Sequence, residues 1–427
     1  MLTRRVFLRG SAIAMAGFGS APRWLARAAS TGQGKRKILV AIFQRGACDG
    51  LNVVAPFGEK RYYELRPSIA IAAPTTGAIW MGGSAGGGAA AGRAVPFNGN
   101  GANAIDLDGH FGLHPALQPL KELWDKQQLA IVEAVGSPDP SRSHFDAQDY
   151  MESGTPGKPS SDGWLNRALP PAGPDGSPLR AVAVGSELPR TLRGERPAIA
   201  LNNAAQFQTG NQEATTIIED MYATTPDARL GRTGRDAFAA MKTIQAINRE
   251  PYRPSNNAQY GLAGELGRGL QQIARLIKAD AGVEAAFAEI GGWDHHSNEN
   301  PQLSNLLRQF GWGLAAFYAD MGDRMEDIVV VTMSEFGRTA QENGNGGTDH
   351  GHGDVMMALG GPVRGGKVYG AWPGLEKEQL YEGRDLAVTT DFRTVLGELV
   401  RGHLGQKNLA QAFPGFEMGE GLGLLKT

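Results

Sequence analysis

The stretch Asp-Ile-Val-Val-Val-Thr-Met-Ser-Glu-Phe-Gly-Arg-Thr, residues 327–339, decides the fold of this chain. Its apolar run, residues 328–332, is short and mostly β-branched, with polar residues on both sides. Such a run is typical of a strand that is buried on both faces of a parallel sheet. Glu335 comes just after the carboxyl end of this strand, where open α/β sheets bind their ligands. The sequence therefore predicts a ligand site near Glu335.

A second group of polar residues follows this strand. A flexible loop rich in Asn and Gly, residues 341–347, leads to Thr-Asp-His-Gly-His-Gly, residues 348–353. Asp349, His350 and His352 thus lie within four residues of one another. Carboxylates and imidazoles are ligands of divalent cations, and a surface loop has no packing need for them. Metal ligation is the prediction here, and solvated polar side chains are the alternative.

Three further apolar runs are predicted to be buried strands, at residues 37–43, 129–135 and 283–290. An amphipathic helix is predicted over residues 302–321, directly before the strand at 328–332. A strand–helix–strand crossover of this length joins parallel strands, which indicates an α/β fold. The segment 155–285 is predicted to be a variable, partly helical cap or insert.

Acidic residues and histidines follow two of these predicted strands. Asp49 comes after the strand at 37–43, in a turn that contains glycine, where capping of the next helix is the alternative role. Asp294 and His296 follow a pair of glycines after the strand at 283–290. Their spacing can turn both side chains toward one point, and a solvated loop is the alternative. Metal ligation is the functional interpretation of both groups.

Ser143 lies where a helix should begin, after the strand at 129–135 and a loop with two prolines. One interpretation is a cap, because Asp146 follows three residues later as in a capping box. The other is functional, because a helix N-terminus stabilises an anion and a hydroxyl there can face a phosphate or sulfate. The two interpretations do not exclude each other.

The composition excludes some classes of protein. The 427-residue chain has a net charge of −2 and 20% charged residues, which gives no reason to expect nucleic acid as a partner. Its one cysteine, Cys48, cannot form an intramolecular disulfide. The sequence contains no Cys-x-x-Cys motif, which disfavours an exported redox protein.

The first residues are predicted to be an export signal. Thr-Arg-Arg-Val-Phe-Leu-Arg, residues 3–9, resembles a twin-arginine signal, and an Ala- and Gly-rich apolar stretch ends in a small-residue cleavage pattern at residues 26–29. A membrane anchor is the alternative, but strongly apolar residues are few and Pro22-Arg23 interrupts them. Residues 1–29 therefore predict a periplasmic or secreted protein, exported folded by the twin-arginine machinery, with no stable membrane anchor after cleavage.

Several motifs together resemble a known family. They are Arg-Gly-Ala-Cys-Asp-Gly (45–50), Ser-Arg-Ser-His-Phe-Asp-Ala-Gln-Asp (141–149), Gly-Gly-Trp-Asp-His-His (291–296), Ser-Glu-Phe-Gly-Arg-Thr (334–339) and Asp-His-Gly-His-Gly (349–353). With the signal, they look like an exported bacterial family known as domain of unknown function 1501. Their order resembles the alkaline-phosphatase-like superfamily of sulfatases, phosphatases and phosphomutases. This resemblance implies a three-layer α/β/α domain with a mostly parallel central sheet over residues 35–427.

The resemblance also implies roles for single residues. It assigns Asp49 as the first-strand metal ligand, Ser143 as the nucleophile, Asp294 and His296 as ligands of one ion, Glu335 as the acid of a second ion, and His350 or His352 as the late histidine. Phosphatases of the superfamily have a His directly after the acid, whereas Phe336 stands here, so the loop with Asp349 and His350 would have to supply that ligand. Pro138 occupies the position of the sulfatase nucleophile, which argues against a formylglycine sulfatase.

The predicted function is an exported hydrolase of phosphate or sulfate esters that depends on one or two divalent ions, Zn, Mn or Ca. Metal would polarise the ester oxygen and lower the pKa of Ser143 or of a bound water. Arg142 or Arg338 would neutralise the non-bridging oxygens of a small anionic ester. The alternative is a non-catalytic periplasmic binding protein on the same fold, with a degraded or structural metal site.

Overall fold

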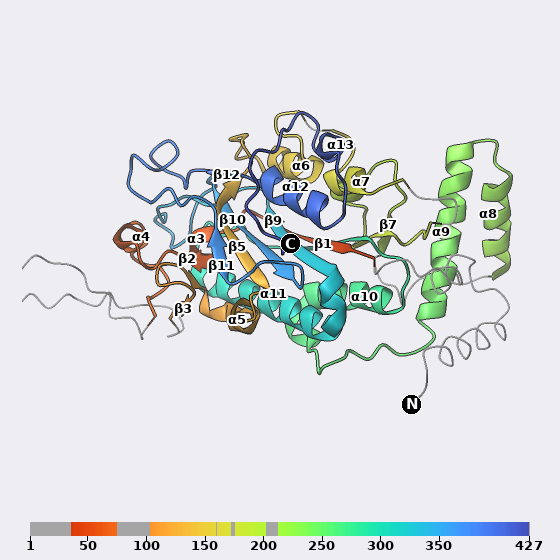
Figure 1. Ribbon diagram of the computed structural model, residues 1–427, viewed down its shortest axis with the longest axis horizontal. Helices are drawn as coiled ribbons and strands as arrows, with labels where there is room; N and C mark the ends of the chain where they lie inside the picture. The colour runs from red at the N-terminus through yellow and green to blue at the C-terminus, as the bar shows by residue number, and fades with distance from the viewer. Residues whose placement is uncertain (1–35, 75–102, 159, 172–175, 202–211, 427) are drawn as a thin grey trace, which may run out of the picture.

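The computed structural model describes residues 36–74, 103–158, 160–171, 176–201 and 212–426 (Figure 1). The predicted export signal, residues 1–29, lies outside the described residues. No helix within these ranges is both long enough and apolar enough to cross a membrane.

A mostly parallel sheet forms the centre of the molecule, with the strand order β11-β5-β10-β9-β1-β8-β6-β7 and with β12 beside β5. The strands are β1 (Ile38–Arg45), β5 (Leu129–Gly136), β6 (Ala181–Val184), β7 (Ile199–Leu201), β8 (Ala285–Gly291), β9 (Ile328–Ser334), β10 (Asp354–Gly360), β11 (Lys367–Tyr369) and β12 (Thr390–Asp391). β10 runs antiparallel to both of its neighbours, and the other pairs are parallel. The predicted α/β class is confirmed.

Helices cover both faces of this sheet (Figure 1). One face carries α5 (Gln118–Asp125), α10 (Gly264–Lys278) and α11 (Glu299–Met321), and the other carries α6 (His144–Ser153), α7 (Trp164–Ala168), α12 (Phe392–Gly402) and α13 (Leu409–Ala412). Alternate residues of β1 belong to the two cores: Val40 and Ile42 to the first, Leu39 and Ala41 to the second. Because both faces are buried, the central strands are apolar throughout. This is the three-layer α/β/α arrangement that the resemblance implies.

The four predicted strands agree with β1, β5, β8 and β9 to within two residues at each end. The predicted helix at 302–321 is α11, which begins three residues earlier, at Glu299. β10 is not among the predicted strands. Its sequence, Asp-Val-Met-Met-Ala-Leu-Gly, has one β-branched residue and follows a loop rich in glycine, so its strand propensity is weak.

The segment 155–285 supplies β6, β7 and α10 as well as a pair of helices. These two helices, α8 (Gln212–Thr224) and α9 (Ala228–Ile247), lie at one end of the molecule (Figure 1). Because α7 also lies in this segment, part of the segment completes the sheet and both helical layers, and its role as a cap stays a prediction.

Short elements surround this framework. They are the small sheet β2 (Val54–Ala55), β4 (Gly112–Leu113) and β3 (Ile105–Asp106), the helices α3 (Gly50–Val53) and α4 (Lys60–Leu65), and the 3₁₀ turns η1 (Pro115–Leu117), η2 (Arg190–Leu192), η4 (Tyr260–Ala263) and η5 (Gly322–Asp327). α3 directly follows the loop that holds Asp49.

The strand directions bring the carboxyl ends of β1, β5, β8 and β9 to one edge of the sheet. The loops after these strands carry the polar clusters of the sequence. Open α/β sheets bind their ligands at this edge, so the fold places these clusters where a site is expected.

Candidate metal centre

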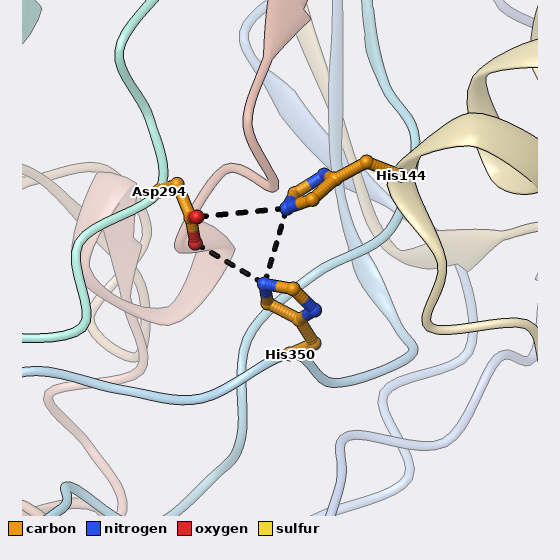
Figure 2. A group of neighbouring side chains, drawn as sticks. All are labelled: His144, Asp294 and His350. Atoms are coloured by element: carbon orange, nitrogen blue, oxygen red, sulfur yellow. Dashed lines mark hydrogen bonds and ion pairs between the residues drawn. The ribbon is translucent and has the colours of Figure 1, made fainter.

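Three histidines and one aspartate converge at the carboxyl edge of the sheet. His144 is the first residue of α6, which follows β5. Asp294 and His296 come from the loop after β8, and His350 comes from the loop between β9 and β10. Figure 2 shows His144, Asp294 and His350 turned toward one another from separate segments. Their ligand atoms all lie within 4.8 Å of one another.

The separations between the ligand atoms are short and similar. His350 Nε2 lies 3.1 Å from His144 Nε2 and 3.1 Å from His296 Nε2. Asp294 Oδ1 lies 3.2 Å from His350 Nε2 and 2.9 Å from His296 Nε2. Asp294 Oδ2 lies 3.6 Å from His144 Nε2. His144, His350 and Asp294 thus surround one point, and His296 adjoins them through His350 and Asp294.

The other nitrogen of each imidazole is held by an acceptor. His144 Nδ1 donates to Glu335 Oε1 at 2.8 Å, and His296 Nδ1 donates to Asp349 Oδ1 at 3.0 Å. His350 Nδ1 donates to the carbonyl oxygen of Arg142 at 3.0 Å. Carboxylates and carbonyls only accept hydrogen bonds, so each Nδ1 carries the hydrogen. Metal-ligating histidines are typically oriented in this way.

This arrangement requires a positive charge at the centre of the cluster. With hydrogen on every Nδ1, three neutral imidazoles turn bare Nε2 lone pairs toward one another and toward the Asp294 carboxylate. The hydrogen bond to Glu335 raises the pKa of His144, whereas burial lowers the pKa of His350. A proton on His144 is therefore the natural competitor of a cation, and cation binding would release it. The donor set fits a divalent metal ion.

Glu335 orients His144 and does not reach the centre itself. The carboxylate is buried, and Oε1 accepts from Gly46 N at 2.9 Å and Gln148 Nε2 at 2.9 Å as well as from His144. Burial alone would raise the pKa of Glu335, but these hydrogen bonds lower it. The predicted direct ligand is therefore corrected to an outer partner, because three donors occupy the oxygen that faces the cluster.

Arg338 binds Asp294 from the interior of the protein. Its side chain is fully buried, and Nη1 donates to Asp294 Oδ1 at 2.7 Å while Nε donates to Thr348 Oγ1 at 3.1 Å. Burial would raise the pKa of Asp294, but the hydrogen bond and charge of Arg338 lower it. The predicted contact between Arg338 and substrate is corrected, because a buried guanidinium bound to Asp294 cannot also face solvent.

Arg142 is also engaged elsewhere. Its guanidinium forms ion pairs with Asp385 at 2.6 Å and Glu382 at 2.8 Å, while its carbonyl oxygen holds His350. The predicted role in neutralising a substrate is corrected to one in positioning, because two carboxylates already compensate its charge.

Asp49 is not a ligand of this cluster. Both of its oxygens are bound by Arg66, at 2.6 Å and 2.8 Å, and both side chains are buried. Arg66 also donates to the carbonyl oxygen of Thr339 at 2.9 Å. Burial would raise the pKa of Asp49, but Arg66 lowers it. The predicted first-strand ligand is corrected to one half of a buried ion pair.

His352 lies apart from its neighbour His350. Its Nε2 donates to the carbonyl oxygen of Ser137 at 2.9 Å, and its ring packs edge-on against Tyr381. The side chain is buried, so the predicted metal role is corrected to a structural one. Asp349, which is exposed, supports His296 and is an outer partner of the cluster.

Ser143 is the N-cap residue of α6, as predicted, but its side chain makes no capping hydrogen bond. It is half-buried and directly precedes His144. Its role as nucleophile or anion-binding group stays a prediction.

The sequence interpretation missed His144. The residue stands at a predicted helix start after a buried strand, directly after Ser143, and Asp146 two residues later was interpreted as part of a capping box. The sequence signal that could have identified it as a ligand was its position after a buried strand, at the same edge of the predicted sheet as Asp294 and Glu335. Its side chain reaches the cluster because α6 packs beside β9 and Glu335, just after β9, holds the imidazole.

The cluster itself is open to solvent. The side chains of Asp294 and His296 are 42% and 45% exposed, whereas Glu335 beneath them is buried. Structural metal sites are closed, and catalytic sites keep an accessible position. The cluster therefore keeps a position that solvent can reach.

Comparison with known proteins identifies the family. Residues 36–405 match the family described as "Protein of unknown function (DUF1501)", and the chain belongs to it. No curated protein matches the chain.

Solved structures show distant likenesses. A protein of the alkaline phosphatase superfamily from Vibrio parahaemolyticus shares 12% identity and a TM-score of 0.30 over 77% of this chain and 61% of its own. The lipoteichoic acid synthase LtaP from Listeria monocytogenes shares 9% identity and a TM-score of 0.29 over 77% and 66%. An alkaline phosphatase from the Antarctic bacterium TAB5 shares 11% and 0.27 over 78% and 93%. The chain spans only about three fifths of the Vibrio protein, and likenesses at this level say nothing about its reaction.

Proposed function

We propose that this chain is an exported, metal-dependent hydrolase of phosphate or sulfate esters. The observation that supports this most is the convergence of the Nε2 atoms of His144, His296 and His350 on the Asp294 carboxylate, with every Nδ1 held from behind. A divalent cation bound there supplies Lewis-acid chemistry, polarising the ester and lowering the pKa of a water nucleophile.

The donor set favours one ion of the zinc type, held by His144, His350 and Asp294, with His296 beside them. Imidazole-rich sets suit zinc, whereas calcium takes oxygen ligands. Of the other carboxylates predicted as ligands, Asp49 binds Arg66 and Glu335 binds His144, which leaves neither for a second ion.

The remaining residues orient and admit the substrate. Glu335, Asp349 and the Arg142 carbonyl fix the three imidazoles, and Arg338 fixes Asp294. Ser143 stands at the N-terminus of α6 with its hydroxyl free of a capping bond, so it can donate to an oxygen of an anionic ester. The partial positive charge of this helix end favours the same anion.

Export is part of this proposal. The Arg4-Arg5 pair and the cleavage pattern that follows support twin-arginine export to the periplasm or medium. Replacing both arginines with lysine should leave precursor in the cytoplasm, measured by fractionation. Mature protein in the periplasm of that variant would overturn the route.

A second candidate function is a non-catalytic binding protein. It is favoured by the engagement of Arg142 and Arg338, because neither predicted guanidinium is free to neutralise charge that develops in a transition state.

The test combines metal analysis with turnover. We expect about one equivalent of metal in the purified protein by plasma mass spectrometry, and hydrolysis of phosphate or sulfate esters that chelation abolishes and Zn²⁺ or Mn²⁺ restores. His350→Ala should lose both metal and activity, while His110→Ala, outside the cluster, should keep both. Metal without hydrolysis would support the binding protein, and protein without metal would overturn both.

A further inference from the structure

A cavity of about 280 Å³ borders α6, the helix whose first residue is His144. Its walls come from the carboxyl ends of β1, β6 and β8, from α6 and from the loop after β6. Residues that carry the following steps are Arg45, Asp149, Glu152, Glu187, Arg193 and Phe287. The volume is near the lower end for small-molecule sites, so it holds one compact group.

Helix α6 connects this cavity to the metal centre. His144 is its first residue, and Asp149 and Glu152 follow it by five and eight residues. At 1.5 Å per residue this separation is roughly 8–12 Å. A substrate that reached from the cluster into the cavity would need a rigid spacer of that order.

A hydrogen-bonded chain runs along the same path. Gln148 donates through Nε2 to Glu335 Oε1 at 2.9 Å and accepts through Oε1 from Arg45 Nη1 at 3.0 Å. Since Glu335 also holds His144, the wall of the cavity and a metal ligand share one network. The two sites are therefore held in a fixed relation.

Most charges in the wall compensate one another. Arg45 pairs with Glu152 at 2.9 Å and with Glu289 at 2.6 Å. Arg190 pairs with Asp149 at 3.0 Å. These charged groups are already paired with one another, so they are poorly available to bind a ligand.

Two opposite charges in the wall have no such partner. Arg193 donates through Nε to the carbonyl oxygen of Leu188 at 2.9 Å, and no carboxylate pairs with it in the described part of the chain. Glu187, on the loop after β6, likewise forms no ion pair within those residues. Both residues are exposed. The wall thus offers one guanidinium and one carboxylate, and the almost fully buried ring of Phe287 also borders it.

We propose that this cavity binds the zwitterionic end of an aromatic amino acid whose phosphate or sulfate ester lies at the metal centre. Arg193 binds the α-carboxylate, Glu187 binds the α-ammonium, and the ring of a tyrosine-like substrate spans the distance along α6. The inference rests on the proposed hydrolase function, and it names the substrate class. The spacing excludes a serine ester, whose side chain is too short to reach both sites.

The test compares esters that differ only at the distal end. Wild-type enzyme should prefer O-phosphotyrosine or O-sulfotyrosine over the tyramine ester, which lacks the carboxylate, and over 4-nitrophenyl phosphate or sulfate, which lacks both charges. Arg193→Ala should raise KM about tenfold for the tyrosine ester and leave the tyramine and nitrophenyl esters unchanged. Glu187→Gln should raise KM for the tyrosine and tyramine esters alone.

Matched controls are Arg268→Ala and Glu195→Gln, which change exposed charges outside the cavity wall and should not alter any KM. Equal KM values for all aryl esters, unchanged in the cavity variants, would overturn the cavity proposal and leave the hydrolase standing. If no ester is hydrolysed, calorimetry of free tyrosine decides. Binding that Arg193→Ala weakens supports the cavity site, and the absence of binding overturns it.

Discussion

Two aspartates occupy equivalent places in the fold but have different surroundings. Asp49 follows β1 and Asp294 follows β8, and both meet an arginine at the carboxyl edge of the sheet. Arg66 binds both oxygens of Asp49 in a pair that solvent does not reach. Arg338 donates only to Oδ1 of Asp294, which is 42% exposed and surrounded by imidazoles. An acidic residue after a parallel strand therefore indicates only that the residue lies at the carboxyl edge of the sheet. Whether it can bind metal depends on how many of its oxygens are free of an arginine.

The largest expected change in stability concerns the buried ion pair between Asp49 and Arg66. Asp49→Asn removes the carboxylate that binds the buried Arg66 through both of its oxygens, and losing one partner of a buried ion pair costs about 3–5 kcal/mol. We expect the free energy of unfolding to fall by that amount in denaturant titrations, while the metal content per folded protein stays unchanged.

The double variant Asp49→Leu/Arg66→Met is the control for this effect, because replacing both charges with apolar groups of similar size is often nearly neutral. It should recover most of the lost stability. If Asp49→Asn instead keeps its stability and loses metal, Asp49 is a ligand and the contrast between the two aspartates fails.

A smaller effect is expected from Glu335→Gln. The amide keeps the size of the side chain but removes the negative charge that supports His144, and outer partners of metal ligands typically contribute 10–100-fold in metal affinity. Competition with a chelating dye should show an affinity reduced by about that range, with ester hydrolysis falling in parallel at limiting metal.

Asp349→Asn is the matched comparison, since Asp349 supports His296 in the same way from an exposed position. Water can replace the exposed partner, so this variant should lose less affinity than Glu335→Gln. An equal or larger loss of metal affinity in Asp349→Asn would mean that burial of the outer partner does not determine its contribution.

The sequence predicted the edge of the sheet and most of the residues that gather there. Buried parallel strands are continuous apolar runs, so β1, β5, β8 and β9 were recognisable, and the loops after them followed. Asp294, His296 and His350 were predicted as ligands and do converge. The partners of these residues were not predictable, because they come from distant segments.

Arg66 illustrates this limit. It stands seventeen residues after Asp49, at the end of a short helix with no pattern that points to a buried charge. The direction of a side chain depends on packing that local sequence does not encode, which is also why His352, two residues after a ligand, points away to Ser137.

The smallest change in stability is expected at Ser143, and it decides how the open site binds its substrate. Because the hydroxyl makes no capping bond, Ser143→Ala should change the free energy of unfolding by less than about 0.5 kcal/mol, as at ordinary surface positions. A hydrogen bond to a charged oxygen contributes about 1.5–3 kcal/mol, so KM for the ester should rise about tenfold or more, with kcat retained. A fall in kcat by several orders of magnitude would instead make Ser143 the nucleophile. A loss of about 0.5–2 kcal/mol in stability with unchanged kinetics, restored in Ser143→Gly, would make it a cap. Thermal melting and initial rates on the same three proteins separate these outcomes.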